Sequence, residues 1–405
     1  MNSVHRRIPA AAAALTLVFL CAPAAPAVAD STECTFPSKK YEGRPWALQR
    51  VLLDELWKQS TGKKVRVAVI DTGVDIKNPQ LTRAVDAKSG KNFLPKKDKK
   101  GEKIERGNES GTSDTVGHGT KIAGIIAARP AEGTGFVGLA PDATIIPIKQ
   151  NDAEGHGTAE TLVDAINHAV KEEADVINIS QDTANAVSPT PRLQAAIDNA
   201  LSKEIVVVAS AGNDGLGGNV KETYPASYPG VLAVAASDRN NERAAFSQSG
   251  EFVGIAAPGV DMISTVPGGG HCADNGTSFS APYVAAVAAL IKSKHGTWTQ
   301  EQIVAQIQQT AERSIAGHDR LVGWGVVDPV RALTEDDKPI EKPVAHEGVT
   351  RVEAPTPAKF HLGETAEERN ARLATYAVIG GAVLVAAIVG GAVTVRDARR
   401  RTRNP

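Results

Sequence analysis

The sequence has almost no net charge, and this balance limits the classes of partner that it can be expected to bind. Its 405 residues carry 45 lysines and arginines against 46 aspartates and glutamates, a formal net charge of −1. Proteins that bind nucleic acid through its phosphates generally carry an excess of positive charge, so no nucleic-acid partner is expected. The composition is 42% hydrophobic, which at this length is ample for one large core.

Cysteine is also scarce, with three residues in the chain. Cys21 lies in a segment that we assign to a leader, which leaves Cys34 and Cys272 in the body. In an exported protein two cysteines can form one disulfide, but a sequence does not show whether they meet, so pairing and two free thiols both stay open. Loops rich in oxygen ligands are lacking as well. We therefore assign no metal ligand and no cofactor, and calcium binding stays open.

The first 29 residues have the pattern of an export signal. A basic region, His5–Arg7, precedes an apolar run, Ala10–Leu20, and the small residues Ala27–Ala29 form a cleavage site. The bulky residues before Cys21 argue against a lipoprotein signal. We expect the mature chain to begin at Asp30, and residues 30–64 to form an N-terminal arm packed on the main body.

Residues 65–334 alternate short apolar runs with helical patterns. Such runs, rich in β-branched residues, suit a sheet buried on both faces, and they occur at 65–70, 144–148, 176–179, 205–209 and 231–235. Helical stretches lie between them at 120–128, 159–173 and 192–203. This alternation indicates an α/β domain with a mostly parallel sheet and right-handed crossovers. Functional groups in such folds gather at the carboxyl ends of the strands.

The stretch Asn275–Lys292 predicts a buried helix with a reactive group at its start. From Ala281 to Leu290 nearly every residue is small or apolar, and a helix that is apolar on all sides is buried. Pro282 is expected in the first turn, where proline is tolerated. Ser278 then lies at the N-terminal end, where free N–H groups and the helix dipole can stabilise an oxyanion. For this segment alone, a helix-capping serine is the alternative.

Three other polar residues are expected near this serine. Asp71 directly follows the run at 65–70, and Asn213 follows the strand at 205–209. His118, flanked by glycines, opens a helix of small residues. Because these segments end at the same edge of a parallel sheet, Asp71, His118 and Asn213 are expected to meet Ser278 there.

These motifs together resemble those of the subtilisin-like serine proteases. Asp71-Thr-Gly, Gly-His118-Gly-Thr and Gly-Thr-Ser278-x-Ser-Ala-Pro occur in that family's order, and the resemblance covers about residues 51–333. It implies a three-layer domain and a serine endopeptidase that works through an acyl-enzyme. Ser278 would be the nucleophile, His118 the general base and Asp71 the residue that fixes the imidazole. Asn213 and the N–H of Ser278 would form the oxyanion hole.

The string Gly-His-Gly-Thr occurs a second time, and the resemblance gives this copy a different role. It implies that Gly155, His156 and Gly157 form a rim that pairs with extended substrate, rather than supplying the catalytic histidine. The same resemblance implies that the primary pocket is walled by Ser180, Ser210, Ala211 and Gly212. Many relatives continue with Leu-Gly after the first of these serines, whereas this chain has Gln181–Asp182. The preference of the pocket is therefore left open.

A charge-dense insert, residues 88–114, separates the aspartate and histidine motifs. Its lysines and glutamates alternate closely, and a segment of this composition is usually a solvated, mobile loop. A docking surface for a partner or a site of self-cleavage is the functional alternative.

The composition changes after residue 334. Residues 335–374 carry prolines among charges, which suits a stiff linker. Residues 375–395 contain no charged side chain, and a helix of about 20 residues spans the roughly 30 Å of a bilayer core. Arginines dominate residues 396–405, so the positive-inside bias predicts a cytoplasmic tail and a body outside the membrane.

This layout resembles the mycosins, the membrane-anchored proteases associated with type VII secretion. The resemblance implies a single-pass protein of the cell membrane that cleaves proteins or peptides and associates with a type VII secretion membrane complex. The alternative is a structural subunit that stabilises such a complex, with cleavage secondary. Native substrates and oligomeric state stay open.

Overall fold

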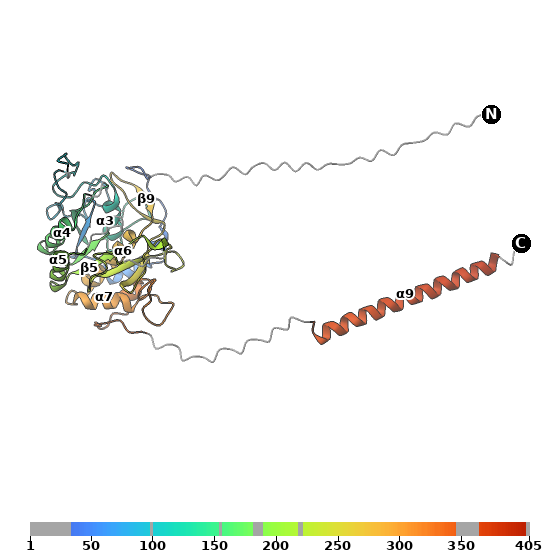
Figure 1. The fold of residues 1–405 in the computed structure, drawn as a ribbon. Coiled ribbons are helices and arrows are strands. Elements are labelled where there is room, and N and C mark those ends of the chain that lie inside the picture. Colours follow the sequence, from blue (N-terminus) through green and yellow to red (C-terminus); the bar gives the residue numbers. More distant parts are fainter. Residues whose placement is uncertain are drawn as a thin grey trace, which may run out of the picture. The chain divides into compact units, whose positions relative to one another are not determined.

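The fold is described from a computed structural model, which covers residues 34–97, 100–153, 156–180, 189–217, 222–345 and 364–401. The expected export signal lies outside these described residues. The chain divides into two compact units, the first ending at His346 and the second beginning at Glu347. The first unit holds the sheet and its helices, and the described part of the second is dominated by one long helix, α9 (Figure 1).

A seven-stranded parallel sheet forms the centre of the first unit. In spatial order its strands are β2 (Lys91–Asn92), β3 (Thr144–Lys149), β1 (Arg66–Asp71), β4 (Val176–Ile179), β5 (Val206–Ser210), β6 (Leu232–Ser237) and β7 (Val253–Pro258). β8 (Met262–Thr265) and β9 (His271–Asp274) form a separate antiparallel pair. The five predicted strands are confirmed, whereas β2, β7, β8 and β9 were not predicted.

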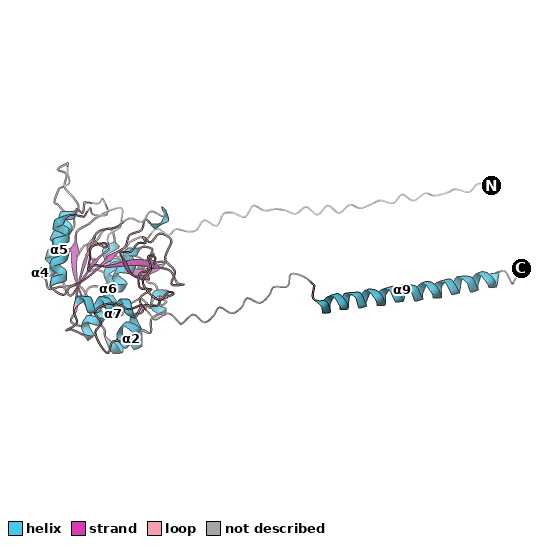
Figure 2. Cartoon of the chain, turned by 60° about the horizontal axis from the view of Figure 1, so that its bottom comes forward, coloured by secondary structure: helices cyan, strands magenta, loops and turns pink. Residues whose placement is uncertain are grey.

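Helices cover both faces of this sheet, as the packing of β1 illustrates. Val67 and Val69 belong to one hydrophobic cluster, and Ala68 and Ile70 belong to another on the opposite face. The first cluster includes α3 (His118–Ala127), α6 (Thr277–Lys294), α7 (Gln300–Gln309) and α8 (Pro329–Thr334), and the second includes α4 (Ala159–Lys171) and α5 (Pro191–Ser202). Strands lie between helices in Figure 2. The predicted three-layer α/β fold is therefore confirmed.

Helix α6 is the buried helix that the sequence predicted, but it begins further before Pro282 than expected. Every residue from Thr277 to Ile291 is buried. Pro282 is the sixth helical residue and so lies in the second turn, which makes its expected first-turn position wrong. The start is set instead by Gly276, whose φ of 152° disfavours a side chain, and by Asn213, whose Oδ1 accepts from the Thr277 N–H. Ser278 is nevertheless the second residue of the helix.

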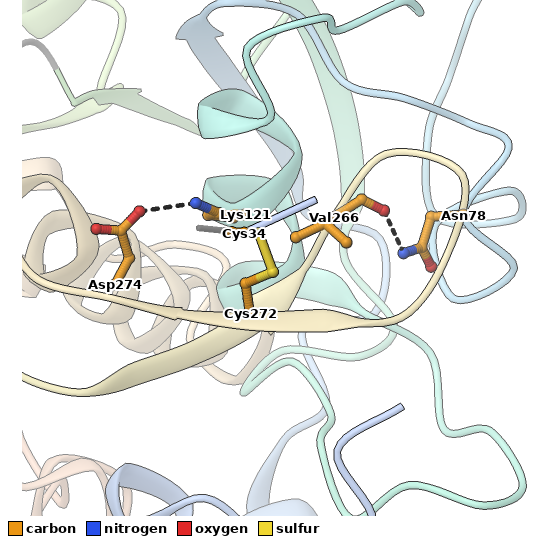
Figure 3. Close-up of a disulfide and its surroundings, with 6 residues drawn as sticks. All are labelled: Cys34, Asn78, Lys121, Val266, Cys272 and Asp274. Atoms are coloured by element: carbon orange, nitrogen blue, oxygen red, sulfur yellow. Dashed lines mark hydrogen bonds and ion pairs between the residues drawn. A yellow bond between two sulfur atoms is a disulfide. The ribbon is translucent and has the colours of Figure 1, made fainter. Parts of the chain in front are cut away.

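The described part of the N-terminal arm packs on the body. α1 (Trp46–Gln49) and α2 (Leu53–Gln59) contribute to the first hydrophobic cluster, and the Tyr283 hydroxyl of α6 donates to the Ala47 carbonyl at 3.2 Å. Cys34 and Cys272 form a disulfide that ties the arm to β9 (Figure 3). The question that the sequence left open is thus answered in favour of pairing. Because the two cysteines are 238 residues apart, the bond restricts a long loop of the unfolded chain, an effect typically worth about 2–4 kcal/mol.

The two ends of the charged insert are built into the body, whereas most of its described residues from Lys96 to Glu109 are exposed. The expectation of a solvated loop over residues 88–114 is therefore wrong for the ends of the insert only. Asn92 of β2 is buried, and its side-chain Nδ2 donates to the carbonyls of Arg106 and Asn108. Asp114, at the other end of the insert, is also buried. The charge density of the segment did not predict these contacts, in which a side chain of the insert forms hydrogen bonds with backbone carbonyls of the same insert. Asp98 and Lys99 lie outside the described residues.

Helix α9 runs from Ala366 to Arg401. Within the described chain it is the one helix long and apolar enough to cross a membrane, with a mean hydropathy of 2.4 over its most apolar window. The helix extends beyond residues 375–395 because the charged segments on either side continue in helical conformation. Its first turns therefore lie in the segment that the sequence assigned to the linker.

Candidate active site

Four elements bring the candidate catalytic residues to the carboxyl edge of the sheet. Asp71 is the last residue of β1, and His118 is the first residue of α3. Ser278 is the second residue of α6, and Asn213 lies three residues after the end of β5. His118, Ser278 and Asn213 line one pocket of about 320 Å³. The structure therefore brings together the residues that the sequence singled out.

Asp71 and His118 are directly hydrogen-bonded. The His118 Nδ1 lies 2.8 Å from the Asp71 Oδ1, which also accepts from the Thr72 N–H at 2.8 Å. Asp71 is buried, with a side chain only 2% exposed, whereas the His118 side chain is 27% exposed. The close approach of the two segments requires Gly119, because a Cβ there would overlap the Gly73 carbonyl oxygen. This contact fixes one ring nitrogen of His118 on the carboxylate.

The electrostatics of the site favour positive charge on His118. Burial lowers the pKa of its imidazole, but the charge and hydrogen bond of Asp71, with the charges of Asp114 and Asp274, raise it above the ordinary value. The ring also packs against Phe279 of α6, with a centroid separation of 5.3 Å. An imidazole in this setting can accept a proton and hold it.

Asn213 is fixed by the start of α6. Its Oδ1 accepts hydrogen bonds from the N–H and the Oγ1 of Thr277, at 2.9 and 3.0 Å. Thr277 Oγ1 in turn accepts from the Gly212 N–H at 3.1 Å. The carbonyl end of the Asn213 amide is thereby directed at the helix start, which sets the orientation of its NH₂ group.

The proposed substrate-binding residues are divided between the pocket and its surroundings. Ser180 lines the pocket with Ser278. His156 holds Asp152 through two hydrogen bonds, from its N–H at 3.0 Å and from its Nδ1 at 2.6 Å, and Asp152 itself lines the pocket. Gly157 packs against the Gln150 carbonyl. Ser210, Ala211 and Gly212 are buried and do not line the pocket. Gly155 and Gln181–Asp182 lie outside the described residues.

Sequence reasoning missed several residues of the pocket lining. Asp274, at the end of β9, lines it and forms an ion pair with Lys121 of α3 at 2.7 Å (Figure 3). Asn151 and Asp152 line it from the loop after β3. Position provided a signal in each case, because Asp274 lies four residues before Ser278 and Asn151 follows a predicted strand. Among the described residues, no group of three or more His, Cys, Asp or Glu side chains is arranged to hold a metal ion.

The chain matches known proteins over the region that contains these site residues. The profile of the subtilase family matches residues 62–325. The chain belongs to the subtilase family. This subtilase is 35% identical to subtilisin E of Bacillus subtilis (strain 168) over 305 residues, which are 75% of this chain and 74% of that protein. It is 37% identical to subtilisin of Bacillus pumilus over 286 residues, covering 70% of this chain and 96% of that protein.

Solved structures of mycosins are similar to this subtilase. MycP1 from the ESX-1 type VII secretion system is 33% identical with a TM-score of 0.64, covering 76% of this chain and 90% of that one. MycP1 from Mycobacterium smegmatis is 32% identical with a TM-score of 0.64, covering 82% and 91%. MycP3 from the ESX-3 system is 32% identical with a TM-score of 0.61, covering 74% and 90%. The chain is a subtilisin-like serine endopeptidase related to the mycosins.

Proposed function

We propose that this subtilase cleaves peptide bonds with Ser278 as nucleophile, His118 as general base and Asp71 as the residue that orients the imidazole. The observation that carries the proposal is the 2.8 Å contact between Asp71 and His118, with His118 lining the same pocket as Ser278. Ser278 attacks the scissile carbonyl and transfers its proton to His118. His118 then gives that proton to the leaving amine, which leaves an acyl-enzyme that water hydrolyses. Asp71 stabilises the intermediate imidazolium without taking its proton.

Two hydrogen-bond donors are proposed to stabilise the negative charge on the oxygen of the tetrahedral intermediate. The N–H of Ser278 belongs to the first turn of α6, where backbone donors have no intrahelical acceptor and the helix dipole is positive. The NH₂ of Asn213 is the second donor, and its orientation is supported by the two hydrogen bonds that Thr277 makes to the carbonyl end. Ser180, His156 and Gly157 are proposed to contact extended substrate, with Gly155, Ser210, Ala211 and Gly212 as further members of this binding region.

Asn213→Ala is expected to lower kcat on a peptide substrate by about 10²–10³ and to leave KM within about twofold, because the oxyanion develops after binding. The magnitude is that known for loss of the corresponding amide in subtilisin. Steady-state kinetics measure it, and circular dichroism checks the fold. Unchanged turnover in a folded variant would remove Asn213 from the mechanism.

We further propose that the protease acts outside the membrane, anchored by α9. The support is the apolar window of α9, the arginines after residue 395 and the N-terminal pattern of an export signal. The proposed organisation is a signal at 1–29, an arm at 30–64, the protease domain at 65–334, a linker at 335–374, a span at 375–395 and a tail at 396–405. The solved MycP1 and MycP3 structures come from type VII secretion systems. We therefore propose exported proteins as substrates and a secretion membrane complex as partner.

Truncation tests the anchor. A chain ending at residue 365 lacks α9 and is expected to move from the membrane fraction to the culture medium. Its kcat/KM on a soluble peptide is expected to stay within about twofold of the full chain, because the protease domain and α9 belong to separate compact units. Cell fractionation with labelling by a serine-directed phosphonate measures both. Retention of the truncated chain in the membrane, or extraction of the full chain by alkaline carbonate, would contradict the role assigned to α9.

A further inference from the structure

Asp114 is a buried carboxylate that the proposed triad does not use. It lies four residues before His118, in the loop that leads into α3, and only 5% of it is exposed. A carboxylate buried at this depth is costly unless its oxygens are fully hydrogen-bonded. The hydrogen-bond donors around Asp114 therefore show which parts of the structure it holds in place.

The partners of Asp114 come from both sides of the active site. Its Oδ1 accepts from the Thr72 Oγ1 at 2.9 Å, the Val116 N–H at 3.0 Å and the Gly117 N–H at 2.8 Å. Its Oδ2 accepts from the N–H and the Oγ1 of Thr120, at 2.9 and 2.7 Å. Five donors on two oxygens are the pattern of an ionised carboxylate, which accepts only.

The directions of these bonds are fixed by second contacts of the two threonines. Thr72 Oγ1 accepts from the Gly119 N–H at 2.9 Å, so its own proton is directed at Asp114. Thr120 Oγ1 accepts from the Asp75 N–H at 3.0 Å, so its proton is likewise directed at the carboxylate. Each hydroxyl therefore connects Asp114 to one further segment of backbone.

This network joins the direct neighbours of the Asp71–His118 pair. Thr72 follows Asp71 in the chain and Gly119 follows His118, and the Thr72 hydroxyl bridges Gly119 to Asp114. The Asp114 carboxylate also fixes Gly117, the residue before His118, in the left-handed conformation at the start of α3. Both flanks of His118 are thus held by groups bound to one carboxylate.

We propose that Asp114 is a positioning residue for the peptidase reaction: through Thr72 and the first turn of α3 it holds the imidazole of His118 against Asp71, and it adds a second buried negative charge beside them. The inference rests on the proposed triad. Asp114 does not line the pocket, so it acts on the reaction through His118 rather than by touching substrate.

The charged groups around His118 determine the expected pH dependence. Asp71 at the end of β1, Asp114 in the preceding loop and Asp274 on β9 each raise the pKa of His118, against the lowering effect of its burial. Lys121 of α3 is paired with Asp274, and the Lys149 Nζ at the end of β3 donates to the Thr72 carbonyl at 2.6 Å. His156 is paired with Asp152, which lines the pocket. Burial raises the pKa of Asp114 itself, and its hydrogen bonds from Thr120 and Gly117 oppose that rise.

The test is Asp114→Asn in the full chain. Asparagine keeps the shape but removes the charge and places an NH₂ group against N–H and O–H donors. We expect kcat to fall by about 10- to 100-fold, as for a catalytic group misplaced by a fraction of an ångström to an ångström, with KM within about twofold. The acid limb of kcat/KM against pH is expected to move to lower pH, because a negative charge that raised the pKa of His118 is gone.

Two further variants separate positioning from stability. Asp175→Asn is the matched control, because the Asp175 carboxylate accepts from the Arg66 N–H at the opposite, amino end of the sheet. It is expected to lower thermal stability while leaving kcat and the acid limb unchanged. Thr72→Val cuts the bridge to Gly119 and keeps the Asp114 charge, so it is expected to lower kcat about tenfold without moving the acid limb to lower pH.

The outcomes distinguish the inference from the proposed triad. A folded Asp114→Asn variant with wild-type kcat and an unmoved acid limb would overturn the inference, provided that a serine-directed phosphonate still labels the wild type at Ser278. If Asp114→Asn does not fold, wild-type kcat in Thr72→Val overturns it instead. Failure of the wild type to react at Ser278 would contradict the triad itself.

Discussion

Ser278→Ala is expected to lower kcat by about 10⁶-fold, the size of loss known for removal of the nucleophile in subtilisin. In the proposed mechanism Ser278 supplies the oxygen of the acyl-enzyme, and alanine has no hydroxyl to replace it. The residual activity would come from substrate positioning and the oxyanion donors alone. Hydrolysis of a peptide amide followed by mass spectrometry measures the loss, and phosphonate labelling should disappear with it.

Ser280→Ala is the matched control for this prediction. Ser280 lies two residues further along α6 in the same motif, but its Oγ donates to the Pro258 carbonyl at 3.1 Å and it does not line the pocket. Its replacement is expected to change stability by about 1 kcal/mol, the usual worth of one buried hydrogen bond, and to preserve labelling. Cleavage that persists in Ser278→Ala would show that another group is the nucleophile.

Ser278→Ala also tests the alternative function, that of a structural subunit. If the chain is chiefly a structural subunit of a secretion complex, secretion should survive Ser278→Ala and fail only when the whole gene is deleted. If proteolysis is required, both changes should block secretion. Comparing the two in cells that express equal amounts of protein separates the hypotheses.

The parts of the fold that were predicted best are the buried segments in which nearly every consecutive residue is apolar. The runs at 65–70 and 176–179 became β1 and β4 because strands buried on both faces need apolar residues at every position. The apolar stretch after Ser278 became α6 for the same reason. β2 is only two residues long and is specified by polar contacts of Asn92, which leave no hydrophobic pattern.

The residues of the proposed triad could be singled out because each of them belongs to a local motif, whereas the rest of the pocket lining depends on long-range contacts. Asp274 lies in an unpredicted strand and faces the pocket through its pairing with Lys121, 153 residues away. Pairing of Cys34 with Cys272 depends on how the arm crosses β9, which no local pattern encodes. The role that we infer for Asp114 was hidden by its charged neighbours in the insert.

The largest ambiguity in the sequence was which of two Gly-His-Gly-Thr histidines is the base, and the local geometry of the two is similar. His118 contacts Asp71 at 2.8 Å and His156 contacts Asp152 at 2.6 Å, and both imidazole side chains are 27% exposed. A carboxylate partner alone therefore does not identify the base. The two differ in their third neighbour, because His118 packs against Phe279, the residue after Ser278, and lines the pocket, whereas His156 does not line it.

His118→Ala is consequently expected to lower kcat by about 10⁶-fold, as does loss of the base in subtilisin, and to abolish labelling by a serine-directed phosphonate, since the Ser278 hydroxyl is a weak nucleophile without a proton acceptor. His156→Ala is the matched control. It removes a hydrogen-bonded imidazole from a similar Gly-His-Gly-Thr string and should preserve labelling, with any change confined to KM through the freed Asp152. Labelling that survives in His118→Ala and is lost in His156→Ala would reverse the assignment, because the proton must pass to whichever imidazole the nucleophile can reach.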